Sequence, residues 1–461
     1  MENELNVKSL DLTQFHHFNR NGVATSVFDY AVFEYIIRNY PIFVCGFPYI
    51  YQGGVYVPDR SGTKIKQIIR GLLYPEFIRS RVINQVYNLV VEAEELQKHF
   101  SELNNHPASY INFKDCMLNV QTMERITHDA KYLSINQIPF RYADIKRAGL
   151  GKEIEKFFDF IFSSAEDREM FLEYAGLCFT TDTRQQRFLT MCGLGGTGKS
   201  VLIRLLENAV GIGNISNVSM QELSKRFSTS LLVGKTLNSC ADLSLGMLVD
   251  SSVIKKLLGE DFVVAEYKGK DGFMFKNYSK LLFSTNMLPT ITAERTNGFY
   301  RRLLILKMDR LPNKPDPELA SKLMKEPPYF IYLAVNALHT LYNRGSILVS
   351  ENSKQAVAQM WKDSDVVQAW LDDCCTVDSN LKIERGKAYN SFNKYCEETE
   401  RQSLTRNGFF KALRTKNFAE VRGRSERYFT GISFKKVTVK SDGNGEFVKV
   451  TDEELAELPF A

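Results

Sequence analysis

Hydrophobic and polar positions follow different patterns along successive parts of the 461-residue chain. Up to about residue 150, short helical and strand-like stretches alternate with turn signals such as "YQGGVYVPDRSG" and "NHPASY". From residue 151, "EIEKFFDFIFSSAEDREMFLEYAGLCF" places apolar residues at three- and four-residue spacing, which predicts helices. From residue 186, apolar strand-like runs alternate with helical segments, as in a parallel sheet with crossover helices.

Polar breaks divide the second half of the chain. The proline-rich stretch "LPNKPDPEL" interrupts the alternating pattern at 311–319, and helical spacing then resumes to about residue 360. The polar stretch "KDSD" precedes a C-terminal module. The sequence therefore predicts an α/β protein made of consecutive segments. Their boundaries are 1–150, 151–185, 186–310, 311–362, 363–440 and 441–461.

The segment "RFLTMCGLGGTGKS" at 187–200 joins a strand candidate to a helix candidate. Its glycine, lysine and serine spacing fits a phosphate-binding loop, in which glycines let backbone N–H groups point at phosphate oxygens. Lys199 would reach the β- and γ-phosphates, Ser200 would hold Mg²⁺, and the following helix would direct its positive end at the phosphates. The alternative is a glycine-rich turn of an ordinary α/β protein. The predicted nucleotide-binding residues are Gly193, Gly195, Gly196, Thr197, Gly198, Lys199 and Ser200.

Further along, strand-like segments each place a polar residue where chemistry on ATP would need one. "KTLNSCADLS" brings Asp242, which could hold Mg²⁺ directly or through water. "KLLFSTN" ends in Asn286, whose amide can orient the water that attacks a γ-phosphate. "NGFYRRLLIL" places Arg301 and Arg302 before another strand, where an arginine supplied to a neighbouring subunit's ATP would neutralise transition-state charge. A salt-bridged strand edge is the alternative, and the sequence does not choose which arginine acts.

Lys199, Asp242, Asn286 and Arg301 follow one another at separations of 43, 44 and 15 residues. This order resembles the superfamily 3 helicases, the AAA+ motors of small DNA viruses, phages and plasmids. "YINFKDCMLNVQT" and "YLSINQIPFRY" resemble the N-terminal domain of phage, plasmid and poxvirus-type primase-helicases, and "AYNSFNKYCEETERQSLTRNGFFKALRTKNF" resembles their winged-helix domain. The likeness covers most of residues 100–435. It is greatest to replication-initiator helicases of phage-like mobile islands, such as staphylococcal pathogenicity islands.

The resemblance implies an AAA+ P-loop ATPase core at 186–310. An α+β N-terminal domain and a helical collar would precede it, and a helical lid and a winged-helix domain at 363–440 would follow. Residues 441–461 form an acidic tail by their charge. The resemblance also implies a homo-hexamer with ATP and Mg²⁺ between subunits, where Lys199, Ser200 and Asp242 lie on one side and an arginine comes from the neighbour. The implied partners are single-stranded DNA, forked or origin duplex DNA, and other replication proteins.

One position departs from the family. The family's acidic strand usually ends in two carboxylates, and here the first of them matches Ala241. Metal binding and water activation therefore cannot be divided between adjacent acids, and Asp242 is assigned to Mg²⁺. Glu260, Asp261 or Glu266 could compensate, so the general base stays open.

Between the Asp and Asn strands, "LLGEDFVVAEYKGKDGFMFKN" has a hairpin pattern with lysines and glycines at its tip. The resemblance implies that this hairpin projects into a central channel and tracks the DNA backbone. Lys268 is the first candidate for that contact and Lys270 the second. A ring of such tips would grip a strand without reading its sequence. The alternative is a solvated hairpin tip.

Positive charge is concentrated near the C-terminus. Residues 401–440 hold eleven Lys and Arg against two Glu, while the whole chain carries +5 and residues 441–461 carry −5. A localised basic module is the electrostatic footprint of a nucleic-acid binder, although basic surfaces also serve solubility.

Within this module, Thr405 is positioned to cap a helix that buries Phe409, Phe410 and Leu413. The helix and the strands after it would meet DNA as a groove-reading helix and a wing that touches phosphates. The alternative is a helical protein-docking domain. The predicted DNA contacts are Asn407, Lys411 and Arg414 on the helix and Arg422, Arg424 and Arg427 on the wing.

Composition and short motifs argue against several classes of protein. No apolar run reaches transmembrane length, and the acidic-polar start "MENELNVKSLDL" differs from a signal peptide, so we expect a cytoplasmic protein. The eight cysteines are scattered without C-x-x-C, which argues against a structural zinc site. No His-x-His of a rolling-circle nickase occurs, and residues 1–150 lack the D-x-D of a primer-making polymerase.

The sequence thus predicts an ATP-driven, ring-forming DNA helicase and replication initiator of a phage-like mobile element. Movement from 3′ to 5′ is implied by the resemblance. An ATP-switched DNA-binding regulator that unwinds nothing, and a bifunctional primase-helicase, are the alternatives.

Overall fold

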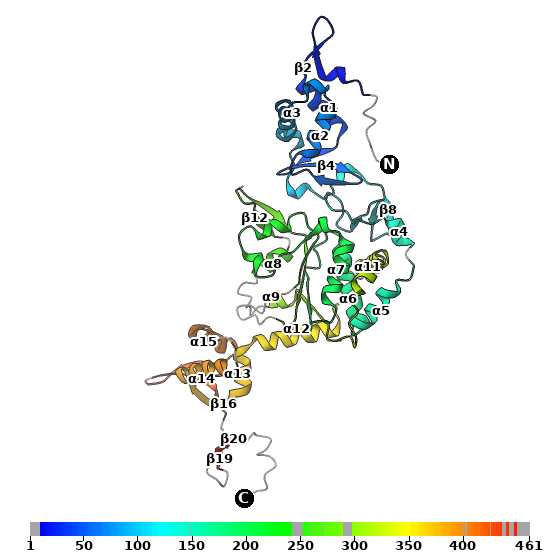
Figure 1. Cartoon of the computed structure of the whole chain (residues 1–461). Coiled ribbons are helices and arrows are strands. Elements are labelled where there is room, and N and C mark those ends of the chain that lie inside the picture. The colour runs from blue at the N-terminus through cyan, green and yellow to red at the C-terminus, as the bar shows by residue number, and fades with distance from the viewer. Residues whose placement is uncertain are drawn as a thin grey trace. The chain divides into compact units, whose positions relative to one another are not determined.

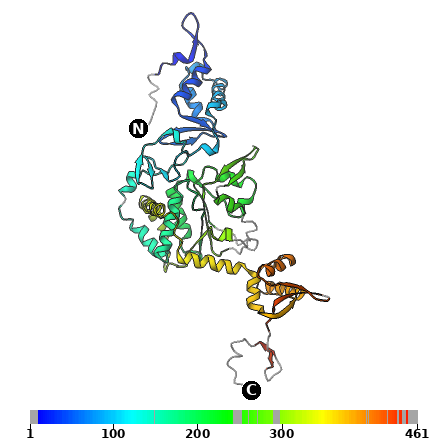
Figure 2. The same cartoon turned by 180° about the vertical axis from the view of Figure 1, so that it is seen from behind.

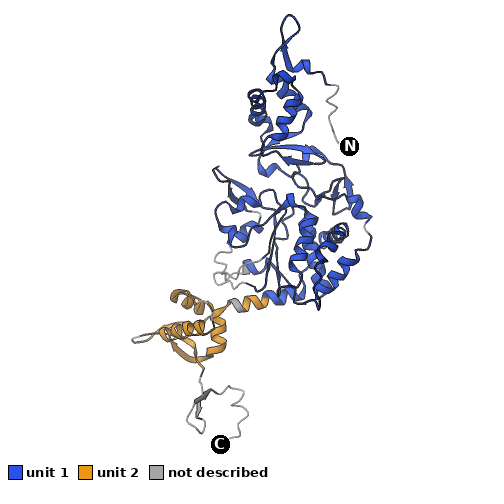
Figure 3. Cartoon of the chain, in the orientation of Figure 1, with its two compact units in different colours: residues 1–289, 296–357 blue, residues 290–295, 358–461 orange. Residues whose placement is uncertain are grey.

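The computed structural model describes residues 10–147, 149–241, 252–259, 261–269, 271–288, 297–399, 401, 403–424, 426–435, 439–441 and 447–449. The chain forms two compact units (Figure 3). Unit 1 comprises residues 1–289 and 296–357, and unit 2 comprises residues 290–295 and 358–461.

Unit 1 is built around a five-stranded sheet with the strand order β10-β11-β14-β9-β15. All neighbouring strands pair in parallel, which confirms the predicted α/β fold with a parallel sheet. Because parallel strands end at the same edge, the residues that follow β9, β11 and β14 gather there. The strands are β9 (Phe188–Cys192), β10 (Ile215–Ser216), β11 (Leu237–Ala241), β14 (Lys280–Thr285) and β15 (Leu303–Lys307).

Helices cover this sheet, and Figures 1 and 2 show α6, α7 and α11 on one side of it and α8 on the other. The predicted helical region after residue 151 forms α5 and α6, and Ser164 caps α6 by accepting a hydrogen bond from the Asp167 N–H at 3.1 Å. Gly176 lets α6 approach α11 closely, since a Cβ there would lie 2.5 Å from the Ala334 carbonyl oxygen. The helices are α5 (Lys152–Ile161), α6 (Ala165–Leu177), α7 (Lys199–Val210), α8 (Ser252–Leu258), α9 (Asn297–Tyr300), α10 (Leu319–Leu323), α11 (Pro327–Arg344) and α12 (Glu351–Ser364).

The N-terminal part of unit 1 mixes helices with small antiparallel sheets, as predicted for residues 1–150. Helices α1, α2 and α3 pack around one apolar core that includes Ile36, Ile69 and Val86. The helices are α1 (Asp29–Asn39), α2 (Thr63–Gly71), α3 (Ser80–Glu92) and α4 (Tyr142–Lys146). The strands are β1 (His16–Phe18), β2 (Ala24–Val27), β3 (Ile42–Val44), β4 (Pro48–Gln52), β5 (Val55–Pro58), β6 (Tyr110–Asn112), β7 (Met117–Asn119) and β8 (Glu124–Ile126).

Two asparagines connect this N-terminal part to the sheet region. The Asn104 side-chain amide donates to the Tyr278 hydroxyl and to the Asn136 side-chain oxygen, both at 3.0 Å. The Asn136 amide in turn donates to the Asn214 side-chain oxygen and to the Gly234 carbonyl, both at 2.9 Å. Hydrogen bonds between partly buried groups in one network reinforce each other, so this polar hub fixes the N-terminal part against the core.

Unit 2 has the order α13 (Val366–Cys374), β16 (Cys375–Glu384), α14 (Arg385–Glu398), α15 (Arg406–Thr415), β17 (Glu420–Arg422) and β18 (Arg427–Phe434). Its strands form an antiparallel sheet, β16-β18-β17, and its core contains Trp370 and Phe392. The Thr405 hydroxyl accepts a hydrogen bond from the Gly408 N–H at 3.2 Å, which confirms the predicted cap. Phe409, Phe410 and Leu413 are buried as predicted. A short hairpin follows, β19 (Val439–Ser441) with β20 (Phe447–Lys449).

Candidate nucleotide site and basic surfaces

The predicted phosphate loop lies between β9 and α7, at the carboxyl edge of the parallel sheet. Gly193 sits so close to the end of β15 that a Cβ would lie 2.0 Å from the Met308 carbonyl oxygen. Gly198 has φ +96° and forms the N-cap of α7, a conformation that favours glycine. The Thr197 hydroxyl donates to the Leu194 carbonyl at 3.0 Å and closes the turn. The loop therefore leads directly into the N-terminus of α7, where the first N–H groups have no acceptor within the helix, an arrangement that suits an anion.

Two of the residues predicted from the sequence meet at this loop. The Lys199 ammonium donates to the Asn286 side-chain oxygen at 3.2 Å and to the Leu194 carbonyl at 2.8 Å. Asn286 directly follows β14, and β14 pairs with β9 so that Thr285 lies beside Cys192. The parallel pairing of these two strands is what brings residues 87 positions apart into hydrogen-bonding distance. Ser200 is exposed in the first turn of α7.

The structure describes only some of the acidic residues that were candidates for binding Mg²⁺ or for activating water. Asp242 and Glu260 lie outside the described residues, and Ala241 ends β11 beside Ser284 of β14. Glu266, at the end of β12, forms a two-point ion pair with Arg226, at 2.7 and 2.9 Å. Among the residues that the structure describes, no group of three or more His, Cys, Asp or Glu could hold a metal ion.

The adjacent arginines before β15 have different surroundings. Arg302 is half-buried and donates to the Gly298 carbonyl at 2.7 Å and to the Gln186 side-chain oxygen at 3.2 Å. Burial, and then the positive charge of Arg301, lowers the pKa of Arg302. Arg301 has an exposed side chain, while its carbonyl accepts a hydrogen bond from the Arg187 guanidinium. The Arg302 guanidinium is thus hydrogen-bonded within its own chain, whereas the Arg301 side chain is exposed to solvent.

Arg187 was not among the residues predicted from the sequence. It precedes β9 directly, and burial together with Arg301 and Arg302 lowers its pKa. Its place immediately before the apolar strand was the only signal for it in the sequence. That position indicates no chemical role by itself, because the role depends on β15 pairing beside β9.

The predicted hairpin is present, with β12 (Phe262–Glu266) paired antiparallel to β13 (Gly272–Lys276). Lys268 is exposed at its tip, and Lys270 lies outside the described residues. The strands bury Val263, Ala265 and Phe275 toward the protein. The opposite face exposes Phe262, Val264 and Met274 by 55%, 66% and 66%. The hairpin therefore combines a charged tip with an apolar outer face.

In unit 2, the predicted DNA-contacting side chains are exposed. They are Asn407, Lys411 and Arg414 on α15, Arg422 on β17, and Arg424 and Arg427 near the β17–β18 turn. Arg385, Arg414 and Arg427 surround Glu420 at 2.7, 2.7 and 3.2 Å. Burial raises the pKa of Glu420, but the hydrogen bonds and charges of these arginines outweigh it, so the pKa lies below its ordinary value.

Two family models match parts of the chain. Residues 64–163 match a family described as "D5 N terminal like", and residues 191–302 match a "Family of unknown function (DUF5906)". The first match supports the primase-helicase type of family that the sequence resembles.

Solved structures of the C-terminal region of NrS-1 are weakly similar. "The A form apo structure of NrS-1 C terminal region-CTR" is 10% identical, with 87% of this chain and 98% of that chain covered and a TM-score of 0.49. A second apo structure of that region has the same identity and coverage and a TM-score of 0.48. Separately, no helix among the described residues is long and apolar enough to cross a membrane.

Proposed function

We propose that this protein is an ATP-driven, ring-forming DNA helicase and replication initiator of a phage-like mobile element, of the superfamily 3 type, that moves 3′ to 5′. The observation that carries the proposal is the meeting of Lys199 and Asn286 at a glycine loop on the carboxyl edge of a parallel sheet. That edge is where nucleotides bind in open α/β sheets. The "D5 N terminal like" match at residues 64–163 supports the same kind of replication protein.

The loop residues suit a nucleoside triphosphate. The Lys199 ammonium now donates to neutral oxygens, and an anionic phosphate would be a stronger acceptor for it. Asn286, released from Lys199, would orient the attacking water. Ser200, exposed beside Lys199, and Asp242 would hold Mg²⁺, which would neutralise phosphate charge. Arg301 would reach the ATP of the neighbouring subunit, because its side chain is exposed whereas Arg302 is bonded within its own chain.

DNA would be gripped in two places. Lys268, together with Lys270 two positions later in the sequence, would hold the single strand through its phosphates and move with the β12–β13 hairpin. In unit 2, the succession of helix, strand, two helices and a two-stranded hairpin supports a winged-helix domain. There α15 would enter a groove of origin duplex, and Arg422 and Arg424 would touch phosphates.

The hairpin is tested by unwinding of a 3′-tailed fork. We expect the wild type to separate the strands with ATP, and Lys268→Ala to keep ATP hydrolysis within about twofold while unwinding falls about tenfold or more, because only the charged grip is lost. Lys276→Ala is the matched control, since it removes an exposed lysine from the base of the same hairpin. If Lys268→Ala unwinds the fork at the wild-type rate, the proposal that Lys268 grips the DNA strand is wrong.

Other outcomes separate the alternatives. If the wild type hydrolyses ATP but opens neither a 3′- nor a 5′-tailed fork, the protein is an ATP-switched DNA binder. If it also extends primers on a single-stranded template with nucleoside triphosphates, it is a bifunctional primase-helicase.

The arginine cluster on Glu420 gives a second test, directed at unit 2. Glu420→Gln removes the carboxylate that engages Arg385, Arg414 and Arg427, so more positive charge becomes available to phosphates. We expect the affinity for duplex DNA to rise about threefold to tenfold and to become more salt-dependent, as about one more phosphate is neutralised. Fluorescence anisotropy across a salt series measures both. Glu426→Gln, on the β17–β18 turn, is the control for a simple change in net charge. An equal gain from both variants would contradict a specific role of Glu420.

A further inference from the structure

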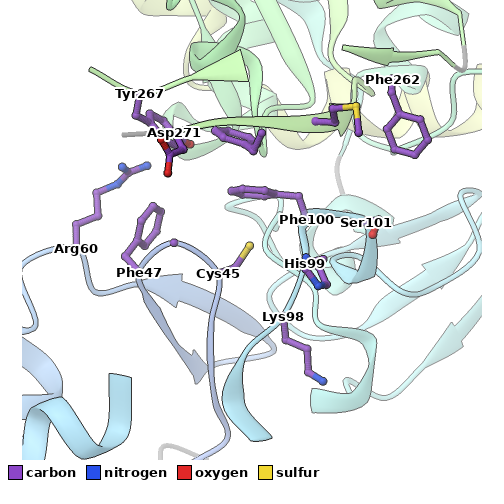
Figure 4. Close-up of a pocket in the computed structure, with 13 residues that line it drawn as sticks. Cys45, Phe47, Arg60, Lys98, His99, Phe100, Ser101, Phe262, Tyr267 and Asp271 are labelled. Carbon is purple, nitrogen blue, oxygen red and sulfur yellow. The ribbon is translucent and has the colours of Figure 1, made fainter. Parts of the chain in front are cut away.

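A cavity of about 670 Å³ lies between the N-terminal part of unit 1 and the β12–β13 hairpin (Figure 4). One wall consists of residues 45–47, Arg60 and residues 98–101, and the other wall comes from the hairpin. This volume lies within the range of small-molecule sites and accommodates one nucleotide. Among the residues that the structure describes, neither the glycine loop nor the proposed DNA contacts line it.

The cavity is rich in flat aromatic surface. Phe100 stacks on Phe273 with ring centroids 4.8 Å apart and an interplanar angle of 23°. Phe273 stacks on Tyr267 at 5.2 Å and 30°, so three rings form a ladder across the two walls. On the N-terminal wall, the Arg60 guanidinium lies 4.2 Å from the centroid of the Phe47 ring. Figure 4 shows Arg60 and Asp271 directed toward each other across the opening.

The walls are held in place by local structure. His99 and Glu102 form a reciprocal cap around the short helix that carries Phe100, with the His99 N–H donating to Glu102 at 2.7 Å. The Lys98 N–H donates to the Val44 carbonyl at 2.8 Å and ties this segment to β3. Two residues after β13, the Tyr278 hydroxyl accepts a hydrogen bond from the Asn104 side-chain amide at 3.0 Å. The aromatic surface is therefore preorganised, and a ligand would not have to order it.

The chemistry favours binding over catalysis. Burial, with a contribution from Glu102, raises the pKa of the Cys45 thiol to about 12, so at neutral pH this side chain is an apolar wall and no nucleophile. Aromatic rings can stack on a base, and a guanidinium beside them can bind the phosphate of the same nucleotide. Proteins hold single strands by this combination. Asp271 can accept a hydrogen bond from an N–H group of the base, such as an amino group or the N3–H of thymine.

We propose that this cavity is a stacking site for one unpaired base of single-stranded DNA, with Arg60 binding that nucleotide's phosphate and the base continuing the ladder of Phe100, Phe273 and Tyr267. Lys268 is the immediate neighbour of Tyr267 and is exposed, so a strand gripped at the hairpin tip passes the mouth of the cavity. The identity of the ligand as DNA rests on the proposed function. As a consequence, the N-terminal part of the chain contacts, through Arg60, the strand that the motor moves.

The test is binding of a fluorescein-labelled single-stranded dT20 oligonucleotide to the full chain without ATP. Stacking is worth about 1–3 kcal/mol per base, so we expect Tyr267→Leu, which removes the end ring of the ladder, to weaken binding about fivefold or more. The salt dependence of this variant should stay that of the wild type. Arg60→Gln should weaken binding and also lower the salt slope by about one phosphate. Tyr30→Leu is the control, since Tyr30 is 57% exposed and does not line the cavity.

Thermal unfolding of each variant separates lost binding from lost structure, and Tyr267→Phe, which keeps a stacking ring, should retain wild-type affinity. Wild-type affinity in both Tyr267→Leu and Arg60→Gln would overturn the proposal. Displacement of the oligonucleotide by dTMP from the wild type but not from Tyr267→Leu would also overturn it, since the site would then hold a free nucleotide. ATP hydrolysis and fork unwinding by the wild type are measured in parallel. If the wild type hydrolyses ATP and unwinds forks while Tyr267→Leu and Arg60→Gln bind normally, only the stacking site fails. If the wild type binds no oligonucleotide, the proposed function fails with it.

Discussion

Lys199→Ala is expected to lower the rate of ATP hydrolysis about 100-fold or more, because it removes a preorganised positive charge from the site where phosphate charge develops. Strand separation should disappear with it. Lys199 is 8% exposed, and its ammonium lies 3.2 Å from the Asn286 side-chain oxygen, on the sheet edge that would receive the phosphates. Phosphate release at saturating ATP, together with fork unwinding, measures both effects.

Lys235→Ala is the matched control for this substitution. Its ammonium also donates to a backbone carbonyl, that of Gly213 at 2.6 Å, but it lies outside the glycine loop. It should keep ATP hydrolysis at the wild-type rate. If Lys199→Ala hydrolyses ATP as fast as the wild type while both variants unfold at the same temperature, the glycine loop is not the nucleotide site.

Arg301→Ala is expected to lower ATP hydrolysis about 10³-fold while leaving the free energy of unfolding unchanged. Its side chain is exposed, so its loss should matter only where it meets a neighbour's ATP. Arg302→Ala should instead lower the free energy of unfolding by about 1–3 kcal/mol, because it leaves the Gly298 carbonyl and Gln186 without their donor. Hydrolysis rates and denaturant unfolding distinguish the two.

A mixing experiment shows whether Arg301 acts across subunits. Arg301→Ala subunits keep Lys199, and Lys199→Ala subunits keep Arg301, so a mixed ring contains some intact sites. Mixing the two inactive variants should therefore restore part of the hydrolysis. If the mixed subunits are shown to co-assemble and hydrolysis does not recover, an arginine finger in trans is excluded. If Arg302→Ala is stably folded but hydrolyses no ATP while Arg301→Ala is active, the arginine finger is Arg302 and not Arg301.

Much of the fold could be predicted from local patterns. The apolar run before Gly193 predicted β9, and "KLLFST" predicted β14, because strands buried on both faces read as continuous apolar segments. Thr405 predicted the start of α15, since a cap depends only on residues a few positions away. The glycine and lysine tip at 267–272 predicted the hairpin for the same reason. The segment boundaries and the roles of the site residues stay predictions.

The sequence by itself determined which segments become strands and helices and where a glycine loop interrupts them, since these follow from contacts between near neighbours. It could not decide that Lys199 touches Asn286, because that contact depends on β14 lying beside β9. Nor could it distinguish Arg301 from Arg302, whose difference arises from Gln186 and Gly298. The ladder of Phe100 and Phe273 joins residues far apart in the chain. Such pairings were decided only by tertiary packing, because side chains distant in sequence acquire defined separations only when the elements that carry them are packed together.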